Sequence, residues 1–116
     1  MMQIEYEATF ENIDKDILRE RLRQVDARLV RKEFLQKRVV FHLPLGHEIP
    51  GAWLRVRDEG NKITCSLKVV SGDKIEDQKE IMIEVSDFEG ASQLLEMLGA
   101  RKKAYQESKR ELWILD

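Results

Sequence analysis

Apolar and charged residues alternate along several segments of this sequence, and the alternation limits the fold more than any other feature. In residues 4–10, the isoleucine, tyrosine, alanine and phenylalanine occupy every second position, and Glu5 and Glu7 stand between them. A period of two places successive side chains on opposite faces of a β-strand. The pattern therefore predicts an antiparallel sheet with one apolar face and one charged face.

Further segments have the extended pattern of a strand: residues 28–43, 52–58, 62–70, 79–85 and 101–115. In residues 52–58, Arg55 and Arg57 share one parity, whereas Leu54 and Val56 share the other. Residues 28–43 carry apolar side chains on both parities, which predicts that this strand is bent or partly buried on both faces.

Two segments with helical spacing interrupt the strands. Asp14 is the predicted N-cap of a helix that ends near residue 26. Ser86 and Glu89 have the spacing of a capping box and predict a second helix, with Gly99 at its C-terminal cap. We expect residues 1–116 to form a single α+β domain, with both amphipathic helices packed outside the sheet.

Charge balance and cysteine content exclude several classes of protein. The 116 residues include 20 basic and 22 acidic side chains, whereas a general nucleic-acid binder is strongly basic. Cys65 is the only cysteine, so no intrachain disulfide can form, which suits a reducing compartment. No apolar run approaches the roughly 20 residues that span a bilayer, and we therefore expect a cytoplasmic protein without a membrane partner.

The charged parities of the strands are predicted to form one continuous surface. Its members are Glu5, Glu7, Arg38, Arg55, Arg57, Lys68, Glu80, Glu84 and, depending on register, Lys109 or Arg110. On an open, flat sheet these residues would form exposed cross-strand ion pairs, each of which contributes little to the stability of the fold. On a curled sheet they would surround a polar cavity, which requires water, a metal ion or a polyanion. Carboxylates bind Mg²⁺ or Mn²⁺ and arginines bind phosphate oxygens, so such a cavity would suit a metal–triphosphate.

The order of these residues resembles the CYTH superfamily, which includes class IV adenylyl cyclases, thiamine triphosphatases and inorganic triphosphatases. The motifs that carry the resemblance are Glu5-x-Glu7, Leu54-Arg55-Val56-Arg57, Ser66-Leu67-Lys68, Glu80 with Glu84, and Lys109-Arg110. The resemblance covers essentially the whole chain. It implies a closed antiparallel β-barrel, called the triphosphate tunnel.

The resemblance also implies a role for each of these residues. The metal-binding positions would be Glu5, Glu7, Glu80 and Glu84, with Mg²⁺ or Mn²⁺ as the cofactor. The phosphate-binding positions would be Arg55, Arg57 and Lys68, together with Lys109 or Arg110. Arg38 is a further phosphate-binding candidate, with a cross-strand pair to a glutamate as the alternative. No residue is assigned a catalytic role.

The sequence departs from the family pattern in three ways. Thr9 stands where the N-terminal motif has a lysine, and Met82 stands where a further glutamate is usual. Family members generally continue well beyond a position such as Asp116, so the tunnel is expected to lack its last strands. A second copy of the chain, as a homodimer, could close the barrel.

Three functions are compatible with these observations. The first is an enzyme that binds ATP, thiamine triphosphate or tripolyphosphate with a metal ion, and either cyclises ATP with release of pyrophosphate or hydrolyses the terminal phosphate. Thr9 disfavours hydrolysis and thus favours the cyclase-like reaction. The second is a nucleotide- or polyphosphate-binding module without turnover, and the third is a structural β-domain.

The remaining candidate residues are expected to be structural. His42, His47 and Cys65 have poor spacing for a zinc site, and Cys65 lies on an apolar parity, where it should be a small core residue. Trp53 and Trp113 are expected to pack in the core or at its rim, with stacking on a base as the alternative.

Overall fold

The computed structural model describes residues 3–4 and 10–116 of the chain. In chain order, its elements are β1 (Gln3–Ile4), α1 (Lys15–Gln24), β2 (Arg28–His42), β3 (Ala52–Asp58), β4 (Ile63–Val70), the 3₁₀-helix Ile75–Asp77, β5 (Gln78–Val85), α2 (Phe88–Met97) and β6 (Arg101–Ile114). The fold is α+β, as the alternation predicted. Among the described residues, no helix combines the length and the apolar character needed to cross a bilayer.

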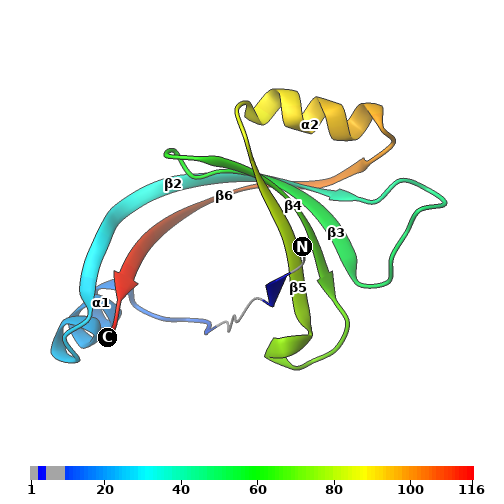
Figure 1. Ribbon diagram of the computed structural model, residues 1–116. Coiled ribbons are helices and arrows are strands. Elements are labelled where there is room, and N and C mark those ends of the chain that lie inside the picture. Colours follow the sequence, from blue (N-terminus) through cyan, green and yellow to red (C-terminus); the bar gives the residue numbers. More distant parts are fainter. Residues whose placement is uncertain (1–2, 5–9) are drawn as a thin grey trace.

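The strands form one antiparallel sheet in the order β1-β5-β4-β3-β2-β6. β1 and β6 lie at opposite edges, and within the described residues they do not pair with each other. The described part of the sheet is therefore open, and the expected closed barrel is not formed by these residues. The sheet nevertheless arches strongly, with α2 on its convex side (Figure 1).

The long strand β2 is bent, as its mixed parity predicted. Its pairing with β6 shifts register between Leu29 and Arg31, between Arg31 and Phe34, and between Val40 and Phe41. An extra residue in one strand bends the pair and increases its twist. β2 and β6 consequently run together away from the other strands to the far end of the molecule, where α1 lies (Figure 1).

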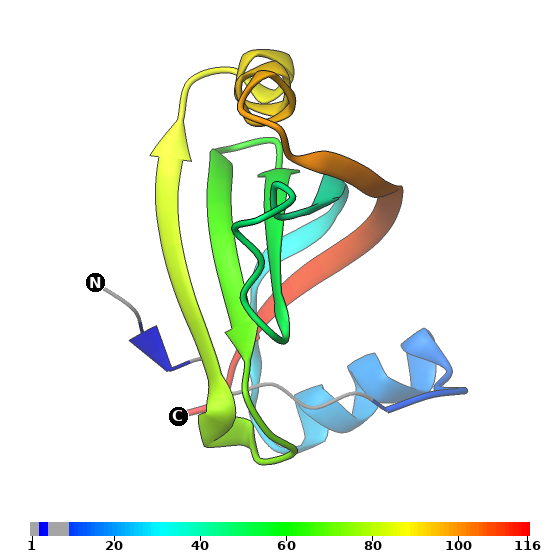
Figure 2. The same cartoon turned by 90° about the vertical axis from the view of Figure 1, so that its right-hand side faces the viewer.

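The apolar core lies between the sheet and α2. Val39, Phe41, Val56 and Ala100 are buried there, and they pack against Phe88, Ala91 and Leu95, among other half-buried side chains. Cys65 also contacts this core, as predicted, and burial raises the pKa of its thiol. By contrast, α1 has no buried residue. The two helices lie at opposite ends of the molecule (Figure 2), so the expected packing on the outside of the sheet holds for α2 only.

The two helix starts test the capping predictions. Asp14 caps α1, because its Oδ1 accepts hydrogen bonds from the backbone N–H groups of Asp16 at 2.9 Å and Ile17 at 3.1 Å. The predicted capping box at Ser86 is wrong. The N-cap of α2 is Asp87, whose Oδ2 accepts a 2.8 Å hydrogen bond from Gly90 N. Serine and aspartate are about equally good N-caps, so the sequence could not distinguish two adjacent candidates.

Replacing Asp87 with alanine should lower the free energy of unfolding by about 1 kcal/mol, because it removes the side-chain acceptor at the start of α2. Replacing Ser86 with alanine should change it by less than about 0.5 kcal/mol, as for other surface positions. Urea denaturation of both variants measures the difference. A larger loss of unfolding free energy for Ser86→Ala than for Asp87→Ala would show that Ser86, and not Asp87, caps the helix.

Candidate functional site

The concave face of the sheet, opposite α2, carries basic and neutral polar side chains. We call this surface the polar face and define it by Gln36, Arg38, Arg55, Arg57, Thr64, Ser66, Lys68 and Glu80. Cross-strand pairing aligns its members in rows: Arg38 is opposite Arg57, and Arg57 is opposite Thr64. In a neighbouring row, Lys68 lies between Trp53 on one side and Glu80 on the other.

Several residues of the polar face are buried as deeply as the apolar core. Gln36 and Thr64 are each 1% exposed, Ser66 is 2% exposed and Lys68 is 6% exposed. The side-chain polar atoms of Gln36, Thr64 and Ser66 have no hydrogen-bond partner among the described residues. Buried polar groups in folded proteins are nearly always hydrogen-bonded to protein, water or a ligand. The hydrogen bonds of these three side chains are therefore left to water, to a ligand or to other parts of the chain.

The cations of the polar face are held by specific contacts. Arg55 forms a 2.9 Å ion pair with Glu80, and both side chains are largely buried. Arg38 Nε donates a 2.6 Å hydrogen bond to the side-chain oxygen of Gln106. The Lys68 ammonium lies 5.8 Å from the centre of the Trp53 ring, within range of a cation–π interaction.

Arg57 contacts the turn between β3 and β4 and also β5, which lies two strands away in the sheet. Its Nε lies 3.3 Å from a carboxylate oxygen of Glu59, and its terminal nitrogen lies 4.0 Å from the sulfur of Met82. Sulfur is only a weak acceptor. Arg57 thus keeps most of its donor capacity for other groups on this face.

The predicted carboxylates are only partly brought to this face. Glu80 and Glu84 both share this face, opposite Lys68 and Thr64; Glu80 is paired with Arg55, whereas Glu84 is exposed. Glu5 and Glu7 lie outside the described residues, as does Thr9. Within residues 3–4 and 10–116, no group of three histidine, cysteine, aspartate or glutamate side chains could hold a metal ion. The described residues alone therefore do not form a metal site.

Lys109 and Arg110 are adjacent on β6 and therefore have opposite parities: Arg110 shares the sheet face of Gln36 and Arg38, two positions beyond Gln36, whereas Lys109 does not. Arg110 is opposite Phe34, which is four residues along β2 from Arg38, a separation of about 13 Å at strand rise. Lys109 is opposite Leu35 and so has the parity of the apolar residues. Both side chains are exposed, and both line a separate cavity beside α1.

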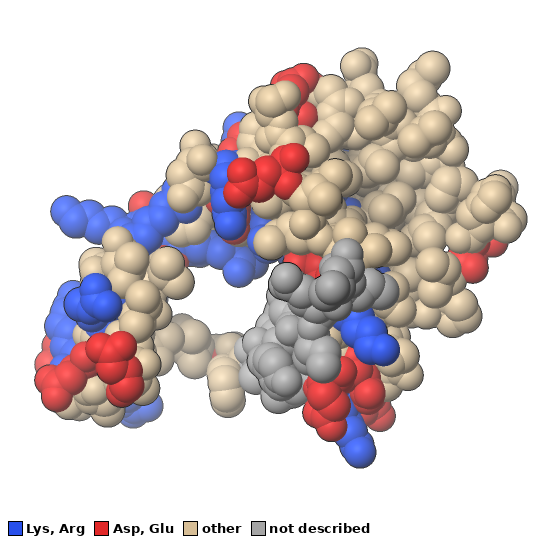
Figure 3. Space-filling view, in the orientation of Figure 1, with Lys and Arg blue, Asp and Glu red and all other residues tan. Residues whose placement is uncertain are grey.

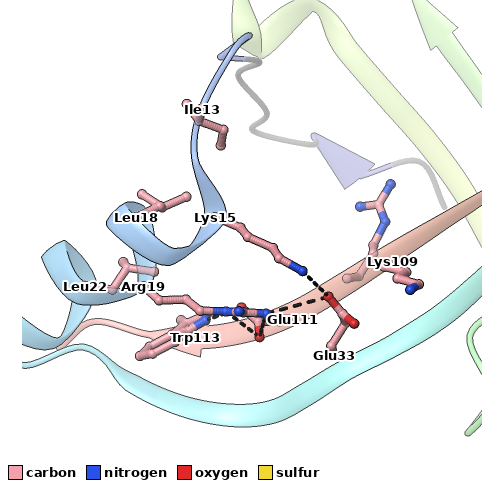
Figure 4. Close-up of a pocket in the computed structure, with 10 residues that line it drawn as sticks. Ile13, Lys15, Leu18, Arg19, Leu22, Glu33, Lys109, Glu111 and Trp113 are labelled. Carbon is pink, nitrogen blue, oxygen red and sulfur yellow. Dashed lines mark hydrogen bonds and ion pairs between the residues drawn. The ribbon is translucent and has the colours of Figure 1, made fainter.

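This cavity, of about 430 Å³, lies between α1 and the ends of β2 and β6 (Figure 4). We call it the α1 cavity. Arg19 crosses it and contacts Glu111 at 2.8 Å and Glu33 at 3.6 Å, while Lys15 lies 3.7 Å from Glu33. The hydrogen bond from Arg19 is the main reason that the pKa of Glu111 is lowered, and it raises the pKa of Arg19 in turn.

Sequence reasoning did not identify the α1 cavity or the buried neutral residues of the polar face. Thr64 and Ser66 share the parity of Lys68, so their face was predictable, but their depth of burial depends on tertiary contacts that the alternation does not show. The pairing of Arg19 with Glu111 joins residues 92 positions apart, and no local pattern in the sequence indicates it.

Comparisons with known proteins support the fold and name no function. No model of a known protein family and no curated protein matches the sequence. Two solved structures are similar: the PH1012 protein from Pyrococcus horikoshii OT3, with a TM-score of 0.73, and the conserved hypothetical protein Pfu-838710-001 from Pyrococcus furiosus, with a TM-score of 0.74.

Both similar structures are longer than this chain. Both have 24% sequence identity to this chain. The first match covers 88% of this chain and the second covers 90%. The matched region covers 60% of the first structure and 62% of the second. At this level of identity, the similarity shows a shared fold.

Proposed function

We propose that the polar face binds the phosphate groups of a triphosphate, as the resemblance to the CYTH superfamily implies. The observation that carries the proposal is the gathering of Arg38, Arg55, Arg57 and Lys68 on one concave face, beside buried polar side chains without described partners. Arginines bind phosphate oxygens through two parallel hydrogen bonds, and lysine adds a point charge. Phosphoryl chemistry depends mainly on such positioning and charge stabilisation.

The proposed role of each described residue follows from its place on this face. Arg57 and Lys68 would contact phosphate oxygens directly, and Arg38 would extend the cationic row toward β6. Arg55 would divide its donors between Glu80 and the ligand. Thr64 and Ser66 would add neutral hydroxyl donors between the cations.

The proposal also includes a metal ion, which would be bound by Glu5 and Glu7. Both residues lie outside the described part of the chain. Glu5 and Glu7 follow β1, which pairs with β5 and places Gln3 opposite Glu80. When bound, Mg²⁺ or Mn²⁺ would screen part of the negative charge of the triphosphate. The proposed enzyme would cyclise ATP or hydrolyse a terminal phosphate.

A binding module without turnover is the second candidate. Two observations favour it: Glu80 is already paired with Arg55, and Met82 places a thioether beside Arg57 where the family pattern has a carboxylate. Both features reduce the acidic groups that are available to a metal ion on this face. Incubation with ATP and Mn²⁺ separates the candidates, because cyclic AMP with pyrophosphate, or ADP with phosphate, appears only if turnover occurs.

Isothermal titration calorimetry with tripolyphosphate tests the binding itself. Intact protein should release heat on titration, and Arg57→Ala should weaken the affinity about tenfold to a hundredfold, because a charge-assisted hydrogen bond is lost. The matched control is Arg21→Ala, which removes one exposed arginine from α1 and should leave the affinity unchanged. Absence of binding by the intact protein, with or without Mg²⁺, would rule out the proposal.

A further inference from the structure

The α1 cavity has the properties of a second ligand site. We propose that it binds a small amphipathic anion, meaning a molecule with one apolar ring or short chain and one carboxylate, sulfonate or phosphate group. The cavity is lined by none of the residues that define the polar face, so the Arg57→Ala titration and the test below can fail separately.

The walls of the α1 cavity include an apolar surface that is open to solvent. Leu18 and Leu22 of α1 face Trp113 of β6 across it, and Ile13 lies at its edge (Figure 4). Ile13 is 58% exposed and Leu18 is 41% exposed, so the cavity leaves apolar area that a ligand can cover. A volume of about 430 Å³ falls in the usual range for small-molecule sites, roughly 300–1,000 Å³.

The charges that line the α1 cavity favour an anion. They comprise four cations, Lys15, Arg19, Lys109 and Arg110, and two carboxylates, Glu33 and Glu111. The carboxylates are occupied by Lys15 and Arg19. Lys109 and Arg110 have no ion-pair partner among the described residues, so an excess of two positive charges remains. Lysine and arginine side chains gather beside the hollow at this end of the molecule (Figure 3).

The apolar wall is fixed in place before any ligand arrives. Trp113 Nε1 donates a 3.2 Å hydrogen bond to Glu111, and the Arg19 guanidinium holds the same carboxylate. The Arg23 guanidinium lies 5.6 Å from the centre of the Trp113 ring. A preformed wall lowers the entropy lost on binding, because few side chains remain to be ordered.

Two fluorescent probes of nearly the same shape test the proposal on the full chain. Anilinonaphthalene sulfonate is the anionic probe, and phenylnaphthylamine is its neutral counterpart. The double variant Lys109→Gln/Arg110→Gln should bind the sulfonate about tenfold more weakly, because charge-assisted contacts are lost, and should bind the neutral probe with unchanged affinity. Leu18→Ser should weaken the binding of both probes.

The matched control is Lys102→Gln/Lys103→Gln, which removes the same net charge from exposed positions of β6 outside the cavity. It should leave both affinities unchanged. An equal loss of sulfonate affinity in this control would overturn the proposal, since net charge alone would explain the result. Undiminished sulfonate binding by Lys109→Gln/Arg110→Gln would overturn it as well. All substituted side chains are exposed, and an unchanged urea midpoint checks that each variant is folded.

Discussion

Replacing Arg55 with alanine should lower the free energy of unfolding by about 3–5 kcal/mol, because it removes the ion-pair partner of Glu80 in a largely buried position. The side chains of this pair are only 5% and 12% exposed, and their atoms are 2.9 Å apart. Urea denaturation at pH 7 measures the loss. The same variant should also lose tripolyphosphate affinity, if it remains folded at the temperature of the titration.

A double variant separates these two effects. Arg55→Met/Glu80→Met replaces both charges with apolar groups of similar length, and such replacements of buried ion pairs are often neutral or stabilising. We expect its unfolding free energy to recover to within about 1 kcal/mol of the unsubstituted chain, while binding of tripolyphosphate stays weak. If the double variant were as unstable as Arg55→Ala, the ion pair would not be the cause of the instability.

Replacing Phe41 with alanine should lower the free energy of unfolding by about 3–5 kcal/mol, since it removes a fully buried aromatic ring and leaves a cavity. Phe41 is 0% exposed and lies at the centre of the core between the sheet and α2. A domain of this size is typically stable by about 5–15 kcal/mol, so the variant should be partly unfolded at moderate temperature. Thermal denaturation followed by far-UV circular dichroism measures the effect.

Phe10→Ala is the control for the loss of an aromatic side chain as such. Phe10 is 77% exposed, so its removal should change the unfolding free energy by less than about 0.5 kcal/mol. Similar losses for Phe10→Ala and Phe41→Ala would mean that the core does not lie where the sheet and α2 meet.

The alternation of the strands predicted which side chains share a face but not how deep they lie. Arg55 and Arg57 were correctly placed together, and so were Thr64, Ser66 and Lys68, because a period of two is a local property. The deep burial of Thr64 and Ser66 depends on tertiary contacts, which no single strand specifies.

The pairing register between β6 and β2 is the second feature that the sequence alone did not predict. The choice between Lys109 and Arg110 depended on how β6 pairs with β2, and that pairing shifts twice between Leu29 and Phe34. Each shift moves every later residue by one position, so the opposing residue cannot be read from the alternation alone. In the structure, both residues line the α1 cavity, and Arg110 is the one that shares the sheet face of Gln36 and Arg38.

The position of β6 has a consequence for how the polar face could be extended. Within the described residues, β6 has a neighbouring strand on one side only, along its whole length from Arg101–Ile114. The backbone amides and carbonyls of an edge strand form a template that accepts an added strand without rearrangement of the sheet. A strand added there would place alternate side chains beside Gln106, which is itself opposite Arg38. The polar face would then extend over one more strand. An added strand would thus widen the polar face at β6, on the side of the sheet opposite the core beneath α2.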